Sequence, residues 1–242
     1  MSQELSDVKP LDWDEFRAHM AEKWSAGEHV AVVAPTGAGK STVALGLLKM
    51  RRWVLAFDLK GGDKTISSTG WPRLKKWPPT KEQREKIAKG EPLRLIVGSA
   101  GRKPEHRAAR TRLHAQVLQA VMQEGGWTIY MPDLKVLTNR AFGGLADEVT
   151  ELLILARDAG VSVVTDFQRP SGVPMEAGDQ ATYMLVSYIR DEKAVQRMSE
   201  MMARSPAEMR GAIAALGRGR YTWLMVSRDP YEPLIVTRSR KA

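Results

Sequence analysis

The sequence contains no cysteine, and its only histidines are His19, His29, His106 and His114. Disulfide bonds and thiolate metal sites are therefore excluded, and the scattered histidines show no metal-ligand spacing. No apolar run approaches the length of about 18 residues that a transmembrane helix needs. The amino-terminal segment MSQELSDVKP also lacks the apolar stretch of a signal peptide. We therefore expect a chain with no membrane segment, located in the cytoplasm.

Basic residues outnumber acidic ones, with 37 Lys and Arg against 28 Asp and Glu, a net charge of +9 and a pI near 9.8. A field of this sign attracts phosphate backbones, so the composition favours a polyanionic partner. Hydrophobic residues make up 43% of the 242 residues, which is enough for the core of one large α/β domain.

Residues 30–42 carry the most informative pattern in the chain. An apolar run typical of a buried strand leads into a glycine-rich segment that closes with Gly39, Lys40 and Ser41, and an apolar helical stretch follows. Strand, loop and helix in this order form the P-loop pattern, with Ala34 at the place of its first glycine. The residues expected to contact a nucleotide are Pro35, Thr36, Gly37, Ala38, Gly39, Lys40, Ser41 and Thr42.

Each part of the P-loop pattern has a physical role in binding phosphate. Gly37 and Gly39 let the backbone curl so that successive N–H groups point at phosphate oxygens, and the helix amino terminus adds partial positive charge. Lys40 can then reach the β- and γ-phosphates, while the Ser41 hydroxyl is expected to ligate Mg²⁺. The pattern predicts that the protein binds a nucleoside triphosphate, taken to be ATP, together with Mg²⁺.

Strand-like and helical patterns alternate along the chain, which predicts an α/β fold with a largely parallel sheet covered by helices on both faces. We expect an amino-terminal helical segment at 1–26 and a P-loop ATPase domain at 27–242, with a basic surface excursion at 61–91. Expected strands lie at 30–34, 53–58, 93–97, 127–131, 161–165, 183–189, 221–226 and 234–237, and expected helices at 11–24, 43–50, 104–123, 145–158, 191–203 and 206–216.

Four places in the chain resemble the FtsK/HerA branch of P-loop motor ATPases. They are the P-loop, the strand end Phe57-Asp58-Leu59-Lys60-Gly61-Gly62, the passage at 156–164 that leads to the family's sensor strand, and Phe167-Gln168-Arg169-Pro170-Ser171 after that strand. The resemblance spans about residues 28–200, and the Gln-Arg-Pro-Ser segment makes it specific. It implies a RecA-like P-loop NTPase core with a mostly parallel central sheet flanked by helices.

Members of that family hydrolyse ATP to move along or pump double-stranded DNA, usually as hexameric rings. The resemblance therefore implies an ATP hydrolase that acts on double-stranded DNA and assembles into a homo-oligomeric ring, expected to be a hexamer. The compact chain has no evident membrane anchor or winged-helix DNA reader. In this it is similar to a small viral or mobile-element member, for which the location is the host cytoplasm.

The fourth expected strand departs from the family pattern. Family members end this strand in Asp-Glu, with the Asp organising Mg²⁺ through water and the Glu polarising the attacking water, whereas here the strand runs into Pro132 and Asp133. In register, Pro132 stands at the Asp position and Asp133 at the Glu position. The resemblance therefore implies Asp133 as the catalytic carboxylate, acting on the water or moving into the metal role. A third interpretation is that Asp133 only caps the turn that follows.

The resemblance also implies two further catalytic residues. Gln168, at the carboxyl end of the fifth expected strand, is expected to face the γ-phosphate, because ligands bind outside the carboxyl ends of strands in open α/β sheets. The alternative is a polar loop residue. An arginine of a neighbouring subunit is expected to stabilise the γ-phosphate, and the candidates are Arg157, Arg169 and Arg190. Arg157 aligns best with the family.

Other charged residues leave two interpretations open. Asp58 and Lys60, at the same sheet edge, either contact the nucleotide or form an ion pair with each other. Two basic clusters form either a nucleic-acid contact or a solvated basic face, and Arg107 and Arg110, three residues apart, are expected to share a helix face. The clusters are Arg73, Lys75 and Lys76, interleaved with Trp71 and Trp77, and Arg102, Lys103, Arg107, Arg110 and Arg112.

Two other classes of function remain open. A nucleotide-driven switch or assembly ATPase with slow or absent hydrolysis fits Pro132, which supplies no side-chain oxygen. A P-loop kinase for a small substrate is disfavoured, because the sequence lacks a lid with paired arginines and gives Gln168 and Arg169 no role. Steady-state ATP hydrolysis with and without double-stranded DNA separates the motor from the switch.

Overall fold

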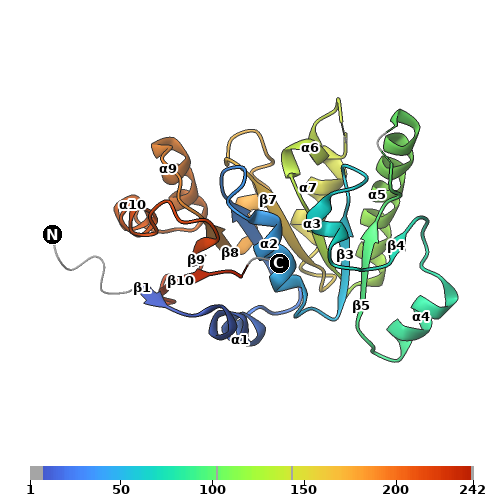
Figure 1. Ribbon diagram of the computed structural model, residues 1–242, viewed down its shortest axis with the longest axis horizontal. Coiled ribbons are helices and arrows are strands. Elements are labelled where there is room, and N and C mark those ends of the chain that lie inside the picture. The colour runs from blue at the N-terminus through green and yellow to red at the C-terminus, as the bar shows by residue number, and fades with distance from the viewer. Residues whose placement is uncertain (1–7, 102, 143, 241–242) are drawn as a thin grey trace.

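Ten strands form one sheet within residues 8–101, 103–142 and 144–240, the ranges that the computed structural model describes (Figure 1). The strands are β1 (Val8–Pro10), β2 (His29–Val33), β3 (Trp53–Phe57), β4 (Arg73–Leu74), β5 (Leu93–Val97), β6 (Thr128–Met131), β7 (Ser162–Phe167), β8 (Ala181–Val186), β9 (Thr222–Ser227) and β10 (Leu234–Arg238). Their order in the sheet is β1-β10-β9-β8-β2-β7-β6-β3-β5-β4. All neighbours from β8 to β4 are parallel, as are β1 and β10, whereas β9 runs antiparallel to β8 and β10.

Helices pack on both faces of this sheet. They are α1 (Trp13–Lys23), α2 (Lys40–Leu48), α3 (Lys64–Ser67), α4 (Lys81–Ala88), α5 (Pro104–Glu124), α6 (Leu134–Thr138), α7 (Ala146–Leu155), α8 (Glu176–Asp179), α9 (Glu192–Met201) and α10 (Pro206–Ala215). Buried side chains of α1, α2 and α3 form one core with one face of the sheet, and those of α5 to α10 form a second core with the other face. The expected α/β fold, with a largely parallel sheet between helical layers, is confirmed.

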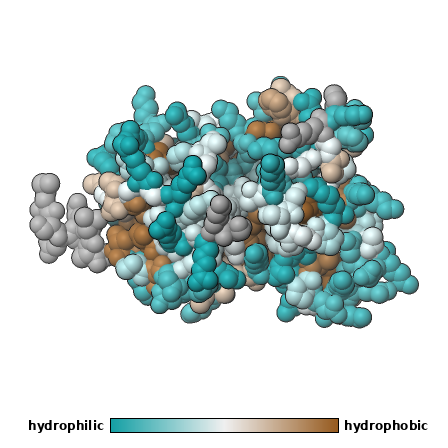
Figure 2. Space-filling view, in the orientation of Figure 1, coloured by the Kyte–Doolittle hydropathy of each residue, from teal (hydrophilic) through white to brown (hydrophobic). Residues whose placement is uncertain are grey.

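The central strands are buried along their length and mostly apolar, because helices cover both faces of the sheet. Every residue of β2, β6 and β7 is buried, and alternate side chains of β2 enter the two cores, Ala31 and Val33 on one side and Val30 and Val32 on the other. On the face seen in Figure 2 hydrophilic side chains predominate, and apolar ones gather in small separate areas. No helix in the described ranges is long and apolar enough to cross a membrane.

The helix expected at 11–24 is confirmed as α1, and its start has a clear local cause. The Asp12 side chain accepts hydrogen bonds from backbone N–H groups of the first turn, and the Glu15 carboxylate accepts one from the Asp12 N–H at 2.9 Å. This reciprocal capping satisfies N–H groups that have no partner within the helix. Phe16 and Met20 are fully buried against the sheet. The unexpected strand β1 precedes the helix and extends the sheet beside β10.

Residues 61–91, expected as a basic surface excursion, contain three short elements. β4 pairs with β5 as the last strand of the sheet, with Leu74 buried in one core, and Ile66 of α3 is buried in the other. No residue of α4 is fully buried, so this helix forms the outward part of the segment. The excursion is therefore attached to the sheet at β4 and projects from it at α4 (Figure 1).

A buried ion pair attaches β4 to the end of β3. The Asp58 side chain is fully buried, and Arg73 Nη2 lies 2.9 Å from Asp58 Oδ2. Burial by itself raises the pKa of Asp58, but hydrogen bonds from Arg73 and from the backbone N–H groups of Gly62 and Asp63 bring that pKa below its usual value. Asp58 therefore pairs with Arg73, and the alternative of an ion pair between Asp58 and Lys60 is wrong.

Replacing Arg73 by Met is expected to destabilise the fold, because the buried Asp58 carboxylate loses its counter-ion. Breaking a buried ion pair costs about 3–5 kcal/mol, which urea denaturation at pH 7 can measure as a lower free energy of unfolding. Folding lowers the pKa of Asp58, so its ionised form stabilises the fold above the unfolded pKa of about 3.9 and stops doing so as the pH falls through the folded-state pKa. The difference between the parent and Arg73→Met should therefore shrink in acid.

The matched control is Arg84→Met on α4, where the arginine is exposed. Surface substitutions of this kind change the free energy of unfolding by no more than about 0.5 kcal/mol. Equal stability of the two variants at pH 7 would show that the Asp58–Arg73 pair does not hold β4 on the sheet.

Candidate nucleotide-binding site

A cavity of about 330 Å³ lies at the carboxyl ends of the central parallel strands. Residues from the P-loop and α2, from the ends of β3, β6 and β7, and from α3 line it together. Parallel strands end at the same edge of a sheet, which is why segments far apart in the sequence meet here. Of the residues expected in the site, the cavity wall contains Thr36, Gly37, Gly39, Lys40, Ser41, Thr42, Asp133 and Gln168.

The P-loop joins β2 to α2 through two glycines in the left-handed conformation. The backbone φ angle is +82° at Gly37 and +102° at Gly39, values that residues with a Cβ rarely adopt. Gly39 is the N-cap of the nine-residue helix α2 and provides no side-chain cap, so the first N–H groups of α2 remain available to an anion. Pro35 and Ala38 line a neighbouring hollow instead of the main cavity. The geometry suits a phosphate cradle, and the nucleotide contact itself stays a prediction.

The ammonium group of Lys40 lies inside the loop. Its Nζ donates hydrogen bonds to the backbone oxygens of Ala34 at 2.9 Å and Pro35 at 3.3 Å. Burial lowers the pKa of Lys40, while the charges of Asp166 and Asp133 act in the opposite direction. The P-loop lysine and two carboxylates therefore surround the same space.

The turn after β6 brings Asp133 into the cavity wall. Asp133 has a φ angle of +48°, which is uncommon for a residue other than glycine. It occupies the N-cap position of α6, but its side chain makes no capping hydrogen bond, so the interpretation of Asp133 as a turn cap is wrong. Pro132 also lines the cavity and supplies no side-chain oxygen. The position of Asp133 suits the expected catalytic carboxylate, and its role stays a prediction.

Asp166 is a site residue that the sequence reasoning missed. It lies within β7, is only 3% exposed, and lines the cavity. The Tyr130 hydroxyl donates to Asp166 Oδ2 at 2.5 Å, and the Asp133 backbone N–H donates to Oδ1 at 3.0 Å. Burial raises the pKa of Asp166, and these two hydrogen bonds and the charge of Lys40 oppose that rise. A signal was available, because Asp166 is the only charged residue in an otherwise uncharged strand.

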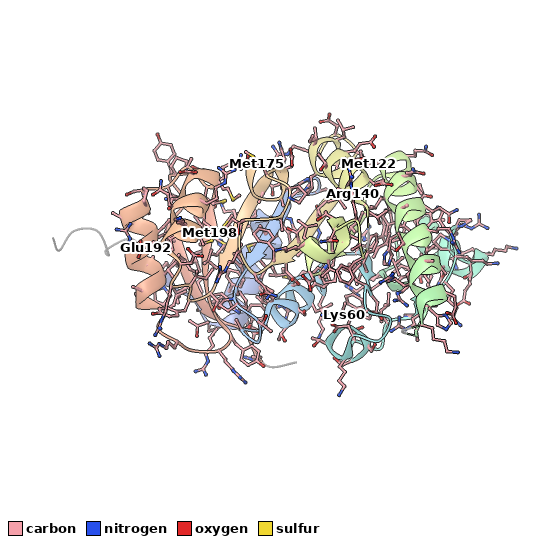
Figure 3. All side chains as sticks on the ribbon, turned by 90° about the horizontal axis from the view of Figure 1, so that it is seen from above. Lys60, Met122, Arg140, Met175, Glu192 and Met198 are labelled. Carbon is pink, nitrogen blue, oxygen red and sulfur yellow. The ribbon has the colours of Figure 1, made fainter. Side chains whose placement is uncertain are left out.

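Gln168 and Lys60 both reach the cavity from the ends of strands. Gln168 follows β7 directly, and its exposed side chain lines the cavity, as expected for a residue that faces a phosphate. Lys60 follows β3 and lines the cavity together with Thr65. Figure 3 labels Lys60 beside the helix α3. Contact of Gln168 with the γ-phosphate and contact of Lys60 with the nucleotide stay predictions.

None of the three candidate arginines is among the residues that line this cavity. Arg157 follows α7 and is exposed, and its Nη2 donates to Thr182 Oγ1 at 3.3 Å, near the amino end of β8. Arg157 therefore lies near the amino ends of the parallel strands, whereas the P-loop of the same chain lies at their carboxyl ends. Contact of Arg157 with the nucleotide of a neighbouring subunit stays a prediction. Arg169 forms an exposed ion pair with Asp191 at 3.6 Å. Arg190 is exposed.

Tyr221, just before β9, is a second wall residue that the sequence did not indicate. Its φ angle is +64°, its N–H donates to the Ala38 oxygen at 3.2 Å, and its own oxygen accepts from the Ser239 N–H at 2.8 Å. Its ring lies so close to Gly39 that a Cβ added there would come within 2.4 Å of it. The contact joins distant parts of the chain, so no local pattern could have revealed it.

Parts of the basic clusters expected to meet nucleic acid are engaged within the fold. Arg73 pairs with Asp58, and Arg110 is buried, with its Nη1 donating to the Gly101 oxygen. Arg107 and Arg110 lie three residues apart on α5 and line the same hollow, so the expectation of a shared helix face is confirmed, but burial of Arg110 leaves only Arg107 of the pair exposed.

The tryptophans of the first cluster are also engaged. Trp71 and Trp77 pack against the two cores, and the Trp77 ring centroid lies 6.2 Å from that of Trp127. They do not stand free as stacking platforms for bases. The cluster residues that remain exposed are Lys75, Lys76, Lys103, Arg107 and Arg112, and Arg102 lies outside the described residues.

The oxygen atoms around the cavity fit Mg²⁺. Ser41, Asp133 and Asp166 all line it. Mg²⁺ prefers oxygen ligands, keeps several waters, and is bound by one or two carboxylates together with substrate phosphates. Within the described ranges no group of three or more His, Asp or Glu side chains could hold a metal ion by itself. This is the arrangement expected for a cation that arrives with a nucleotide.

Comparisons of sequence find no match, either among protein-family models or among curated proteins. Solved structures do match. The genome packaging NTPase B204 from Sulfolobus turreted icosahedral virus 2, in complex with AMPPCP, has a TM-score of 0.59 and 12% sequence identity, over 89% of this chain and 100% of that chain. VirB4 of Thermoanaerobacter pseudethanolicus has a TM-score of 0.57 and 13% identity, over 88% of this chain and 89% of that chain.

The pCW3 conjugation coupling protein TcpA, in its monomer form with ATPγS, has a TM-score of 0.56 and 12% identity, over 88% of this chain and 60% of that chain. At these identities the likeness concerns the fold. The P-loop NTPase fold that the motifs implied is thus confirmed in three dimensions, and the chain shares it with these solved structures.

Proposed function

We propose that this protein is an ATP-hydrolysing motor that acts on double-stranded DNA, of the kind that packages viral genomes. The observation that carries the proposal is the meeting of the P-loop, Asp133 and Gln168 around one cavity. The fold around it is similar to that of B204, which is described as the DNA-packaging ATPase of Sulfolobus turreted icosahedral virus. The net charge of +9 adds a field that attracts a polyanion.

In the proposed reaction water attacks the γ-phosphorus of ATP and ADP leaves, so the protein acts by positioning groups and stabilising charge. The N–H groups at the start of α2, together with Lys40, hold the β- and γ-phosphates. Asp133 polarises the attacking water, and the Gln168 amide orients it toward the phosphorus. Ser41 with a carboxylate of the cavity would hold Mg²⁺, which would supply positive charge to stabilise the phosphates.

A ring would bring the exposed arginine of one subunit to the nucleotide of the next. Arg157 lies on the edge opposite its own cavity, as a residue acting on a neighbour can. Close before it, at the end of α7, the adjacent side chains of Ile154 and Leu155 are 50% and 44% exposed, and such an exposed apolar pair suits a subunit contact. We therefore place the subunit interface around the end of α7, with Arg157 reaching across it.

The exposed basic residues that remain after internal pairing provide the proposed DNA contact. Lys75 and Lys76 follow β4, while Arg107 and Arg112 lie on α5. Trp71 and Trp77, the aromatic side chains interleaved with the first group, are partly buried against the two cores and do not project freely for stacking. The contact is therefore expected to be with phosphates and to be independent of base sequence.

Steady-state phosphate release with and without duplex DNA, alongside mass measurement with ATP present, tests the proposal. We expect duplex DNA to stimulate turnover, ATP to promote hexameric rings, and duplex affinity to fall as salt rises because bound counterions are released. Lys40→Ala should weaken Mg-ATP binding or abolish turnover, since it removes the cation at the β- and γ-phosphates. Lys49→Ala, an exposed lysine at the other end of α2, should behave like the parent.

Three outcomes would count against parts of this proposal. A Lys40→Ala variant that binds and hydrolyses ATP like the parent would show that the P-loop assignment is wrong. A monomer under all nucleotide conditions, indifferent to DNA, would contradict a ring motor. Assembly with ATP but without turnover would favour the nucleotide-driven switch, for which the missing oxygen at Pro132 is the supporting observation.

Mixing two inactive variants tests whether Arg157 acts on a neighbouring subunit. Arg157→Ala keeps the P-loop intact and should lower turnover by about 10³-fold or more, the effect of an arginine that stabilises the transferring phosphate. Lys40→Ala keeps Arg157 intact. In mixed rings, some interfaces combine Arg157 of a Lys40→Ala subunit with the P-loop of an Arg157→Ala subunit, so phosphate release from the mixture should clearly exceed that of either variant alone.

The control for this experiment replaces the Lys40→Ala partner with the double variant Lys40→Ala/Arg157→Ala, which carries neither group. That mixture should remain inactive. If the first mixture is also inactive while both variants co-assemble, Arg157 does not act across the interface.

A further inference from the structure

The end of β6 lacks the acidic residue that the proposed ATPase needs to help hold its metal ion. In P-loop ATPases an acidic residue helps the P-loop hydroxyl to hold the metal ion. Here β6 ends in Tyr130 and Met131, and Pro132 follows, so none of these positions offers a carboxylate oxygen. The next acidic residue, Asp133, lies beyond the strand in a left-handed turn. It would have to serve both the metal and the attacking water.

A carboxylate does lie at the right level, on the neighbouring strand. Met131 of β6 pairs with Thr165 of β7, so the next residue of β7, Asp166, is level with Pro132. Asp166 is buried among the strands and still forms part of the cavity wall. Asp166 therefore places a carboxylate at the same height along the strands as Pro132.

Two hydrogen bonds orient the Asp166 carboxylate in the cavity wall. Tyr130 donates to one Asp166 oxygen, and the Asp133 N–H donates to the other. An ionised carboxylate has about four acceptor positions, so Asp166 retains room to accept hydrogen bonds from water bound to a cation.

A comparison with Asp58 shows that Asp166 is not simply a structural charge. Both are buried carboxylates at the same sheet edge, but Arg73 neutralises Asp58 directly at 2.9 Å. The donors to Asp166 are a neutral phenol and a backbone N–H, and it forms no salt bridge within the described residues. A buried carboxylate without a direct counter-ion is unfavourable, so this position favours a cation in the cavity.

We propose that Asp166 is the carboxylate that orients the nucleotide-bound Mg²⁺, through metal-bound water, in place of the residue that Pro132 replaces. This inference rests on the proposed ATP binding. Ser41 and Asp166 then form the metal side of the cavity, and Asp133 remains free for the attacking water. The two carboxylates therefore have separate tasks, which substitution can distinguish.

The test measures ADP affinity by calorimetry, with Mg²⁺ and with EDTA, for the parent, Asp166→Asn and Asp133→Asn. The parent should bind ADP more tightly with Mg²⁺. Asp166→Asn should lose about 10–100-fold of this Mg²⁺-dependent gain, the usual effect of removing a group that orients metal ligands. Its affinity in EDTA should match the parent, which shows that the P-loop is intact. Asp133→Asn should keep the gain in affinity while phosphate release falls by about 10²–10⁴-fold.

The outcomes separate this inference from the proposed function. A parent that binds no nucleotide under any condition would contradict the ATPase itself. A parent that binds Mg-ADP, with an Asp166→Asn variant that keeps the full Mg²⁺ gain, would overturn the role of Asp166 alone. Loss of the Mg²⁺ gain in Asp133→Asn but not in Asp166→Asn would assign the metal to Asp133.

A second measurement needs no substitution and so does not depend on whether Asp166→Asn folds. Fe²⁺ takes the place of Mg²⁺ with ADP, and ascorbate with hydrogen peroxide then generates radicals that cleave the backbone near the metal. Peptide mass spectrometry should find nucleotide-dependent cuts at 165–167 as well as around Ser41. Cuts around Ser41 without any at 165–167 would overturn the proposal.

Discussion

The parallel pairing of β2, β7 and β6 is the constraint on which the candidate site depends. Backbone hydrogen bonds place Val32 of β2 beside Asp166 of β7, and Met131 of β6 beside Thr165. The P-loop, the Asp166 carboxylate and the turn at Asp133 therefore lie at the same height along the strands, at their carboxyl ends. Because side chains alternate between the faces of a strand, a slip of β7 by one residue would turn Asp166 toward the opposite helical layer. The chemistry of the cavity thus follows from strand register.

Segments from both ends of the described chain hold the P-loop helix in place. α1 packs so closely against α2 that a Cβ on Gly46 would come within 2.6 Å of the Trp13 ring. On the other side, Tyr221 lies against Gly39 and bonds to the loop backbone. β1 also pairs with β10, so the amino-terminal segment shares its core with the P-loop domain. The P-loop backbone must stay curled to bind phosphate. Packing of α1 against α2 and of Tyr221 against Gly39 supports this conformation.

Local sequence patterns were sufficient to predict the strands and helices whose apolar periodicity is strong. The strands expected at 30–34 and 93–97 and the helix expected at 104–123 agree with β2, β5 and α5 to within one residue at each end. The short elements β1, β4, α3 and α8 were not expected, because two to four residues carry too little periodicity to distinguish an element from a loop. The pairing of β4 with β5 and of β1 with β10 is what makes those short segments strands.

The sequence by itself determined the P-loop, because the residues that form it are contiguous and the two glycines set its backbone locally. Only the tertiary structure decided which charges are available for chemistry. Arg73 and Arg110 count as basic residues in the sequence, yet one is bound to Asp58 and the other is buried. Asp166 lies in a fully buried strand, yet neighbouring segments supply its hydrogen-bond donors and its side chain lines the cavity. Burial and choice of partner depend on contacts between distant segments, which a local pattern of residues does not contain.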